Sequence, residues 1–190
     1  MLGFDDLLPR RPHRIAVAGV SGVGKTTLAA RIAEITGSPH TEIDALFHGP
    51  GWTERPEFLD DVTRLVATES WVTEWQYAPA RPLLTSRADL LVWLDLPFWT
   101  CVFPRVVRRT LRRRIRREEL WNGNIEPPFH TFLTDPEHIV RWSIRTRYKY
   151  DERIPAMADD AAAPDIVHLR TPAEVEPWIV GPLRASVFPA

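Results

Sequence analysis

One octapeptide constrains the fold of this chain more than any other feature. Residues 19–26 read Gly-Val-Ser-Gly-Val-Gly-Lys-Thr, which fits the pattern G-x-x-x-x-G-K-[ST]. The apolar run at 14–18 predicts a buried strand before it, and the periodicity from Lys25 to about Thr36 predicts a helix after it. A strand, a glycine-rich loop and a helix in this order form a cradle in which backbone N–H groups bind phosphate.

The cradle assigns roles to individual residues. Its glycines let the backbone approach phosphate oxygens closely. Lys25 is expected to reach the β- and γ-phosphates of a nucleotide, and the Thr26 hydroxyl is expected to ligate Mg²⁺. A glycine turn that carries a lysine by chance is the alternative, but the chain has only two lysines, Lys25 and Lys149. The predicted nucleotide-binding residues of the loop are Gly19, Ser21, Gly22, Val23, Gly24, Lys25, Thr26 and Thr27.

The amino-acid composition indicates the number of domains and excludes several classes of protein. The chain has 190 residues, of which 44% are apolar and 26% are charged, as is typical of one folded domain. No apolar run is long enough for a membrane span, so we expect no membrane partner. A lone cysteine, Cys101, excludes an intrachain disulfide and a multi-cysteine zinc site. We therefore expect a single cytoplasmic domain over residues 1–190.

Strand and helix patterns alternate along the chain, which predicts an α/β fold with a parallel sheet covered on both faces. A long arginine-rich helix is expected after the fourth strand, and Pro104 must either kink this helix or mark its start. The five expected strands are residues 14–18, 40–43, 71–75, 90–94 and 165–169.

Acidic residues follow these strands at the sheet edge where parallel sheets bind ligands. Glu42 and Asp44 alternate onto one side of the second strand, and Glu74 ends the third. Such carboxylates can hold Mg²⁺ or accept the proton of an acceptor hydroxyl, although each could also be a solvated strand end. Asp95, after the fourth strand, could equally cap a helix. For Asp44 a functional role is favoured over a structural one, because this residue leads from an apolar strand into a loop that contains Gly, Pro and Trp.

Eight of the 22 arginines lie between Arg105 and Arg117. Their guanidinium groups could clamp the phosphates of ATP, or the same charge could bind nucleic acid, or the helix could simply be solvated. The net charge of −1 and the absence of an evident aromatic stacking platform argue against a nucleic-acid partner. We expect two or three of these arginines in the site and the rest on the surface.

Several strings now resemble known proteins. The phosphate loop, Glu-Ile-Asp at 42–44, Leu-Asp-Leu-Pro at 94–97 and the arginine-rich helix resemble the adenylate kinase, shikimate kinase and gluconate kinase group. Within this group, Arg-Arg-Glu-Glu-Leu-Trp-Asn-Gly-Asn at 116–124 resembles the adenylate-kinase-like proteins often labelled topology modulation proteins. The resemblance covers most of residues 14–150.

This resemblance implies a P-loop NTPase three-layer fold whose five strands stand in the order 2-3-1-4-5. It also implies an acceptor-binding arm at about 45–70 and a small lid at about 118–136. The implied activity is transfer of the γ-phosphoryl group of ATP to a small-molecule acceptor, with Mg²⁺ as the second cofactor. ATP rather than GTP follows from the resemblance, since no Asn-Lys-x-Asp string occurs.

The resemblance also implies roles for single residues. Asp44 would bind the acceptor and take its proton, and Glu42 would be the outer acid, near the metal ion held by Thr26. Four arginines would meet the nucleotide or clamp the transferring phosphate, namely Arg105, Arg109, Arg141 and Arg145.

The stretch after the third strand departs from the adenylate kinase pattern. Adenylate kinases carry Asp-Gly-Phe-Pro-Arg there, and many topology-modulation-like sequences carry Asp-Gly-Asn-Tyr, whereas this chain has Glu74-Trp75-Gln76-Tyr77. The change keeps a carboxylate and the tyrosine but argues against a nucleoside monophosphate as the acceptor. The acceptor-binding residues proposed beside Asp44 are Arg55, Glu74, Tyr77 and Arg81.

A second function class stays open on the sequence. The chain could be an ATP-binding regulatory module whose nucleotide state controls a protein or nucleic-acid partner, and the arginine-rich helix supports this alternative. The Asp44 loop and the lid-like segment favour the kinase.

Overall fold

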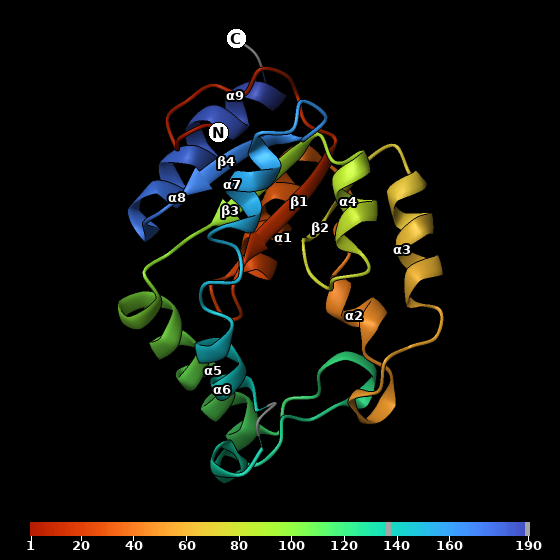
Figure 1. The fold of residues 1–190 in the computed structure, drawn as a ribbon, viewed down its shortest axis with the longest axis vertical. Coiled ribbons are helices and arrows are strands. Elements are labelled where there is room, and N and C mark those ends of the chain that lie inside the picture. The colour runs from red at the N-terminus through yellow and green to blue at the C-terminus, as the bar shows by residue number, and fades with distance from the viewer. Residues whose placement is uncertain (136–137, 189–190) are drawn as a thin grey trace.

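The centre of the protein is a four-stranded parallel sheet, seen in a computed structural model that describes residues 1–135 and 138–188 (Figure 1). The strands stand in the order β2-β1-β3-β4, and all three pairings are parallel. Nearly every strand residue is buried, as expected for a sheet covered on both faces. The strands are β1 (Arg14–Gly19), β2 (Trp71–Glu74), β3 (Leu90–Leu94) and β4 (Asp165–Leu169).

Residues 40–43 do not form the strand that the sequence predicts. His40 makes one isolated parallel bridge to Val72 of β2, and the chain then enters helix α2 (Ile43–Phe47). The backbone N–H of Ile43 donates to Glu74 Oε2 at 3.0 Å, so it is taken by a side chain and cannot extend a ladder. The expected five-stranded sheet of order 2-3-1-4-5 is therefore wrong, because the described residues form four strands in the order β2-β1-β3-β4 and no strand at 40–43.

Helices cover both faces of the sheet, as the alternating pattern predicts (Figure 1). Besides α2 they are α1 (Lys25–Thr36), α3 (Phe58–Ala67), α4 (Arg81–Arg87), α5 (Phe103–Arg116), α6 (Ile139–Arg145), α7 (Arg153–Ala158), α8 (Pro172–Trp178) and α9 (Arg184–Val187). Short 3₁₀ or π turns occur at η1 (Pro50–Trp52), η2 (Phe98–Val102), η3 (Trp121–Gly123), η4 (Phe129–Leu133) and η5 (Ile179–Leu183). Pro104 lies in the first turn of α5 and marks its start.

Two apolar cores lie on the two faces of the sheet, because successive side chains of a strand point to opposite faces. Ile15 and Val17 of β1 pack into a core closed by α1, α5 and the C-terminal helices. Ala16 and Ala18 pack into a second core closed by α3, α4 and α7. The sheet is thus held rigidly from both sides, with its carboxyl edge free to carry a site.

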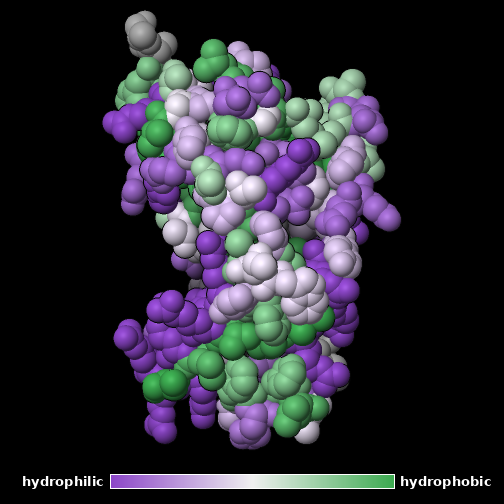
Figure 2. All heavy atoms as spheres, turned by 90° about the vertical axis from the view of Figure 1, so that its left-hand side faces the viewer, coloured by the Kyte–Doolittle hydropathy of each residue, from purple (hydrophilic) through white to green (hydrophobic). Residues whose placement is uncertain are grey.

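In Figure 1 the predicted lid and the part of the predicted arm around α2 lie below the sheet, whereas α3 stands beside α4. The arm holds α2, η1 and α3, and the lid holds η3 and η4, while Pro136 at the end of the predicted lid lies outside the described residues. Figure 2 shows the side of the molecule that carries α5 and α8, where hydrophilic residues gather on the projecting lower part beside a hydrophobic band. None of the described helices is long and apolar enough to cross a membrane.

Candidate nucleotide and acceptor site

The phosphate loop connects β1 to α1 through glycines that no other residue could replace without strain. Gly19, Gly22 and Gly24 have φ values of 149°, 80° and 111°. A Cβ atom on Gly22 would stand 2.2 Å from Cγ2 of Val106, so only glycine allows the loop to pack on α5. The bare backbone leads directly into the N-terminus of α1, the arrangement that binds phosphate.

Lys25 is buried at the first position of α1, and its Nζ donates to the carbonyl of Val20 at 3.2 Å. Burial lowers the pKa of Lys25 to about 8, while the charges of Asp44 and Glu74 act in the opposite direction. The ammonium group therefore lies within electrostatic reach of two carboxylates.

Glu74, at the end of β2, lies beside the phosphate loop with 2% of its surface exposed. Burial acts to raise its pKa, but hydrogen bonds from His40, the Ile43 backbone and the Thr26 hydroxyl lower the pKa overall. The carboxylate therefore stays ionised beside Thr26. Its Oε1 lies 3.5 Å from Nε2 of His40, and a buried carboxylate is a ligand type that fits a divalent cation.

Glu42 occupies a different position from the one that the sequence suggested for a metal ligand. Its Oε2 accepts a hydrogen bond of 2.8 Å from Trp121 Nε1. The structure brings Glu74, rather than Glu42, to the Thr26 hydroxyl. Asp95 makes an ion pair of 2.9 Å with His168, which accounts for that strand-end acid without a metal.

Asp44 lies in the first turn of α2 and is oriented by two donors. Its Oδ1 accepts hydrogen bonds from Gln76 Nε2 at 2.8 Å and from the Tyr77 hydroxyl at 2.6 Å. Burial and the Asp44 charge raise the pKa of Tyr77 far above its ordinary value, so Tyr77 remains a donor. Oδ2 makes no hydrogen bond among the described residues and is the oxygen left to meet a ligand.

Aromatic rings surround this carboxylate. Phe47 stacks on Tyr77 with centroids 3.8 Å apart, and His48 stacks on Trp121 at 5.9 Å. His48 Nε2 lies 3.2 Å from the Tyr77 oxygen, and burial lowers the pKa of His48, so a neutral imidazole joins the Tyr77–Asp44 chain. The rings place aromatic surface beside the Tyr77–Asp44 pair.

The arm and the lid are joined directly by hydrogen bonds. Asn124, 4% exposed, donates to the carbonyl of Gly49 at 2.8 Å and accepts from the backbone N–H of Trp52 at 2.9 Å. The Trp52 indole donates to the carbonyl of Ile125 at 3.3 Å, and Asn122 donates to the carbonyl of His48. We call these hydrogen bonds the arm–lid contact, because they join the predicted acceptor arm to the predicted lid.

Two of the four predicted nucleotide arginines reach the loop region. Arg105 donates to the carbonyl of Val23 at 3.3 Å. Burial lowers the pKa of Arg109, whose charge also interacts with Asp44, and its Nε has no partner among the described residues. Arg141 and Arg145 instead lie exposed on α6, where they line a shallow hollow with Phe132 and Ile144.

The two remaining predicted acceptor residues differ in environment. Arg55 makes a 3.0 Å ion pair with Asp61 and donates to the carbonyl of Leu46, so it ties α2 to α3 within the arm. Arg81 is buried at the start of α4, with its guanidinium 5.5 Å from the Trp75 ring.

Lys149 is a residue near the site that sequence reasoning did not single out. It lies between α6 and α7, and its charge acts on Lys25 and lowers the pKa of that residue. The scarcity of lysine in an arginine-rich chain was the available signal.

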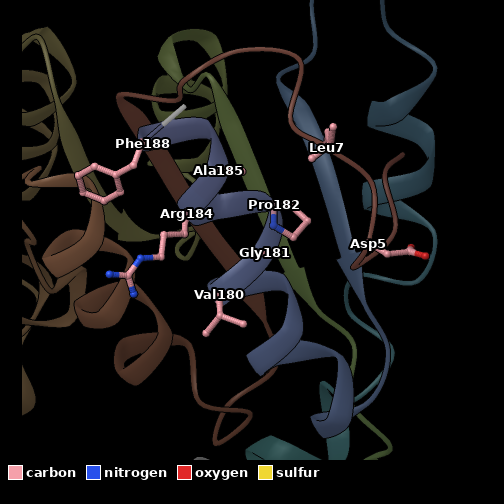
Figure 3. A pocket seen from close by; sticks show the side chains of 8 residues that line it. All are labelled: Asp5, Leu7, Val180, Gly181, Pro182, Arg184, Ala185 and Phe188. Carbon is pink, nitrogen blue, oxygen red and sulfur yellow. The ribbon is translucent and has the colours of Figure 1, made fainter. Parts of the chain in front are cut away.

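A separate hollow lies between the N-terminal segment and the C-terminal helices (Figure 3). Figure 1 places it at the end of the molecule where both termini lie, away from the arm and the lid. It therefore takes no part in the site described above. Its lining residues are Asp5, Leu7, Val180, Gly181, Pro182, Arg184, Ala185 and Phe188.

No protein-family model matches this chain, and no curated protein matches it significantly. Among solved structures, a gluconokinase from Sinorhizobium meliloti 1021 superposes with a TM-score of 0.53 at 20% identity, over 93% of this chain and 95% of that chain. A shikimate kinase from Acinetobacter baumannii in complex with shikimate gives a TM-score of 0.51 at 18% identity, over 92% and 90%. The likeness confirms the expected α/β fold with a parallel sheet, which these two kinases share.

Proposed function

We propose that this protein is a kinase that transfers the γ-phosphoryl group of ATP to a small-molecule acceptor. The observation that carries the proposal is the meeting, at one sheet edge, of Lys25, the Thr26–Glu74 pair and an oriented Asp44. The fold is that of the gluconokinase and the shikimate kinase described above, which supports the same class of reaction. A nucleotide-binding module without an acceptor would not need the oriented Asp44.

The phosphate loop binds the nucleotide in this proposal. Its N–H groups and Lys25 hold the β- and γ-phosphates, and Arg105 and Arg109 reach the same region from α5. Thr26 and Glu74 would hold Mg²⁺, with Glu42 as a further acid on the acceptor side. A Mg²⁺ ion held by these residues would supply positive charge that offsets the charge developing on the phosphates.

Asp44 performs the acceptor chemistry. Gln76 and Tyr77 fix its Oδ1, which leaves Oδ2 to accept a hydrogen bond from the acceptor hydroxyl and then its proton. The attacking oxygen would thereby be held in line with the γ-phosphate above Lys25. The arm–lid contact excludes water, so the phosphoryl group passes to the acceptor rather than to water.

The string that carries the resemblance to topology modulation proteins has a role in this arrangement. Trp121 and Asn124 supply the arm–lid contact and hold Glu42. We propose on this basis that the chain belongs with that group of adenylate-kinase-like proteins.

ADP release from Mg-ATP, measured against a panel of nucleosides, nucleoside monophosphates, sugar acids, polyols and aminoglycoside-type compounds, tests the proposal. A compound should stimulate turnover by the wild-type protein. Asp44→Asn should lower that stimulated rate by about 100-fold or more, the usual contribution of a general base. Lys25→Ala should abolish it, and Asp60→Asn, which changes an exposed acid of α3, should not. Equal stimulation in wild type and Asp44→Asn would contradict the proposal.

A further inference from the structure

The charges of three cations act on one another close to the proposed acceptor site. Arg81 opens α4, Lys149 follows α6 and Arg153 opens α7. Burial lowers the pKa of Lys149, and the charges of Arg81 and Arg153 lower it further, to about 8. Within residues 1–135 and 138–188, no carboxylate lies at ion-pair distance from any of the three side chains.

An aromatic pair holds two of these cations in place. Trp75 and Tyr150 pack with centroids 5.6 Å apart, and the Tyr150 hydroxyl donates to the carbonyl of Trp75 at 3.2 Å. The Arg81 guanidinium lies 5.5 Å from the Trp75 ring, and Lys149 Nζ lies 5.4 Å from the Tyr150 ring. The two charges are thus fixed by packing that joins the end of β2 to the segment before α7.

Arg81 is only partly satisfied within the described residues: its side chain hydrogen-bonds the Tyr150 hydroxyl, but one guanidinium nitrogen has no partner. The residue is 8% exposed, and its Nη1 is buried without a hydrogen-bond partner in the described part of the chain. A buried cationic donor left unpaired is costly, and convergence with two further cations adds repulsion. An anion between the three side chains would remove both costs.

The cluster adjoins the proposed acceptor site. The backbone N–H of Arg81 donates to the carbonyl of Tyr77 at 3.1 Å, and the Tyr77 hydroxyl holds Asp44. On its other side, the charge of Lys149 reaches Lys25 in the phosphate loop. A ligand group bound here would therefore belong to a molecule that also reaches Asp44.

We propose that Arg81, Lys149 and Arg153 form an anion subsite that binds a phosphate or carboxylate group of the phosphoacceptor. The inference rests on the proposed function, because it names the class of molecule that this reaction phosphorylates. The acceptor then carries a hydroxyl for Asp44 at one end and an anionic group for the three cations at the other. In this proposal the nucleotide phosphates bind elsewhere, at the phosphate loop and the arginines of α5.

Lysine acetylation measured by peptide mass spectrometry tests the subsite, because the chain has only two lysines and each can be followed separately. The intact protein, saturated with Mg-ADP so that the phosphate loop is filled, is titrated with inorganic phosphate and, in a second arm, with gluconate. An anion beside Lys149 raises its pKa, and one unit lowers the free amine about tenfold. We expect either or both anions to slow acetylation of Lys149 saturably by about tenfold.

Variants and a neutral probe complete the experiment. Arg153→Met, a change at an exposed position, should weaken protection by about threefold, as expected for a solvent-exposed ionic contact. Arg87→Met, at the exposed far end of α4, is the matched control and should leave protection unchanged. The proposal is overturned if neither anion protects Lys149, if sorbitol protects it equally, or if the two variants behave alike.

The acetylation readout does not depend on turnover, so the subsite and the proposed reaction fail separately. Protection of Lys149 without stimulated ADP release would leave the subsite standing and count against the kinase. Turnover stimulated by neutral acceptors, with no protection of Lys149 by either anion, would support the kinase and overturn the subsite.

Discussion

Replacing Gly22 by alanine tests the packing that positions the phosphate loop against α5. Gly22 has a φ of 80°, and an added Cβ would stand 2.2 Å from Cγ2 of Val106. The left-handed backbone alone costs a non-glycine residue about 1–2 kcal/mol. Val106 is fully buried and β-branched, so it cannot turn away, and forcing an extra methyl into such packing costs about 1–3 kcal/mol more.

Gly37→Ala separates these two contributions. Gly37 has a similar φ of 73°, but an added Cβ would meet nothing within 4 Å. Gly37→Ala should therefore cost about 1–2 kcal/mol, and Gly22→Ala about 2–5 kcal/mol. Urea unfolding monitored by tryptophan fluorescence gives both free energies of unfolding.

A double-mutant cycle completes the test of this contact. Val106→Ala removes the methyl group that Gly22→Ala would meet, so the double variant should be more stable than the sum of the single effects by about 1–3 kcal/mol. Equal losses of stability in Gly22→Ala and Gly37→Ala, or strict additivity in the cycle, would refute the argument that α5 packs on the loop.

Three further results are expected. Because deprotonation of Lys25 above its pKa of about 8 removes a phosphate-binding charge, the calorimetric Kd for Mg-ADP should rise about tenfold from pH 7 to pH 9, and Lys25→Arg should flatten this dependence. Asn124→Ala should lower the free energy of unfolding in urea by about 1–3 kcal/mol, because it leaves the buried carbonyl of Gly49 without its donor. Burial acts to raise the pKa of Asp89, but hydrogen bonds from Arg14 lower this pKa overall. The Arg14–Asp89 pair therefore stabilises the fold at pH values above the ordinary carboxyl pKa, and this stabilisation is lost as the pH falls. Asp89→Asn should reduce the loss of stability that acid causes, measured by urea unfolding at several pH values.

The sequence predicted what depends on neighbouring residues. The octapeptide, the strand before it and the helix after it are local features, and the structure contains all three. The buried β3 strand and the start of α5 at Pro104 follow from an apolar run and from the chemistry of proline. The α/β architecture was predictable for the same reason.

Contacts between distant residues were not predictable in this way. Residues 40–43 have a strand-like pattern, yet a carboxylate 31 positions away takes the N–H of Ile43 and the chain turns into α2. The same Glu74 interacts with the Thr26 hydroxyl, and for this reason we propose Glu74, in addition to the predicted Glu42, as an acid near the metal ion. The partners of Trp121 and Asn124 lie more than 70 positions away in the sequence. The string at 116–124 could therefore be recognised from the sequence, but its contact with the arm could not be predicted.

The fate of the γ-phosphoryl group of ATP tests the central claim most directly. ATP with a labelled γ-phosphate would be incubated with Mg²⁺, the protein and each compound that stimulates ADP release, and the label would be followed into the compound or into inorganic phosphate. We predict that the wild-type protein places the label in the compound and that Asp44→Asn loses this transfer while still binding ATP. Label found in inorganic phosphate alone, at equal rates in wild type and Asp44→Asn, would contradict phosphoryl transfer to an acceptor.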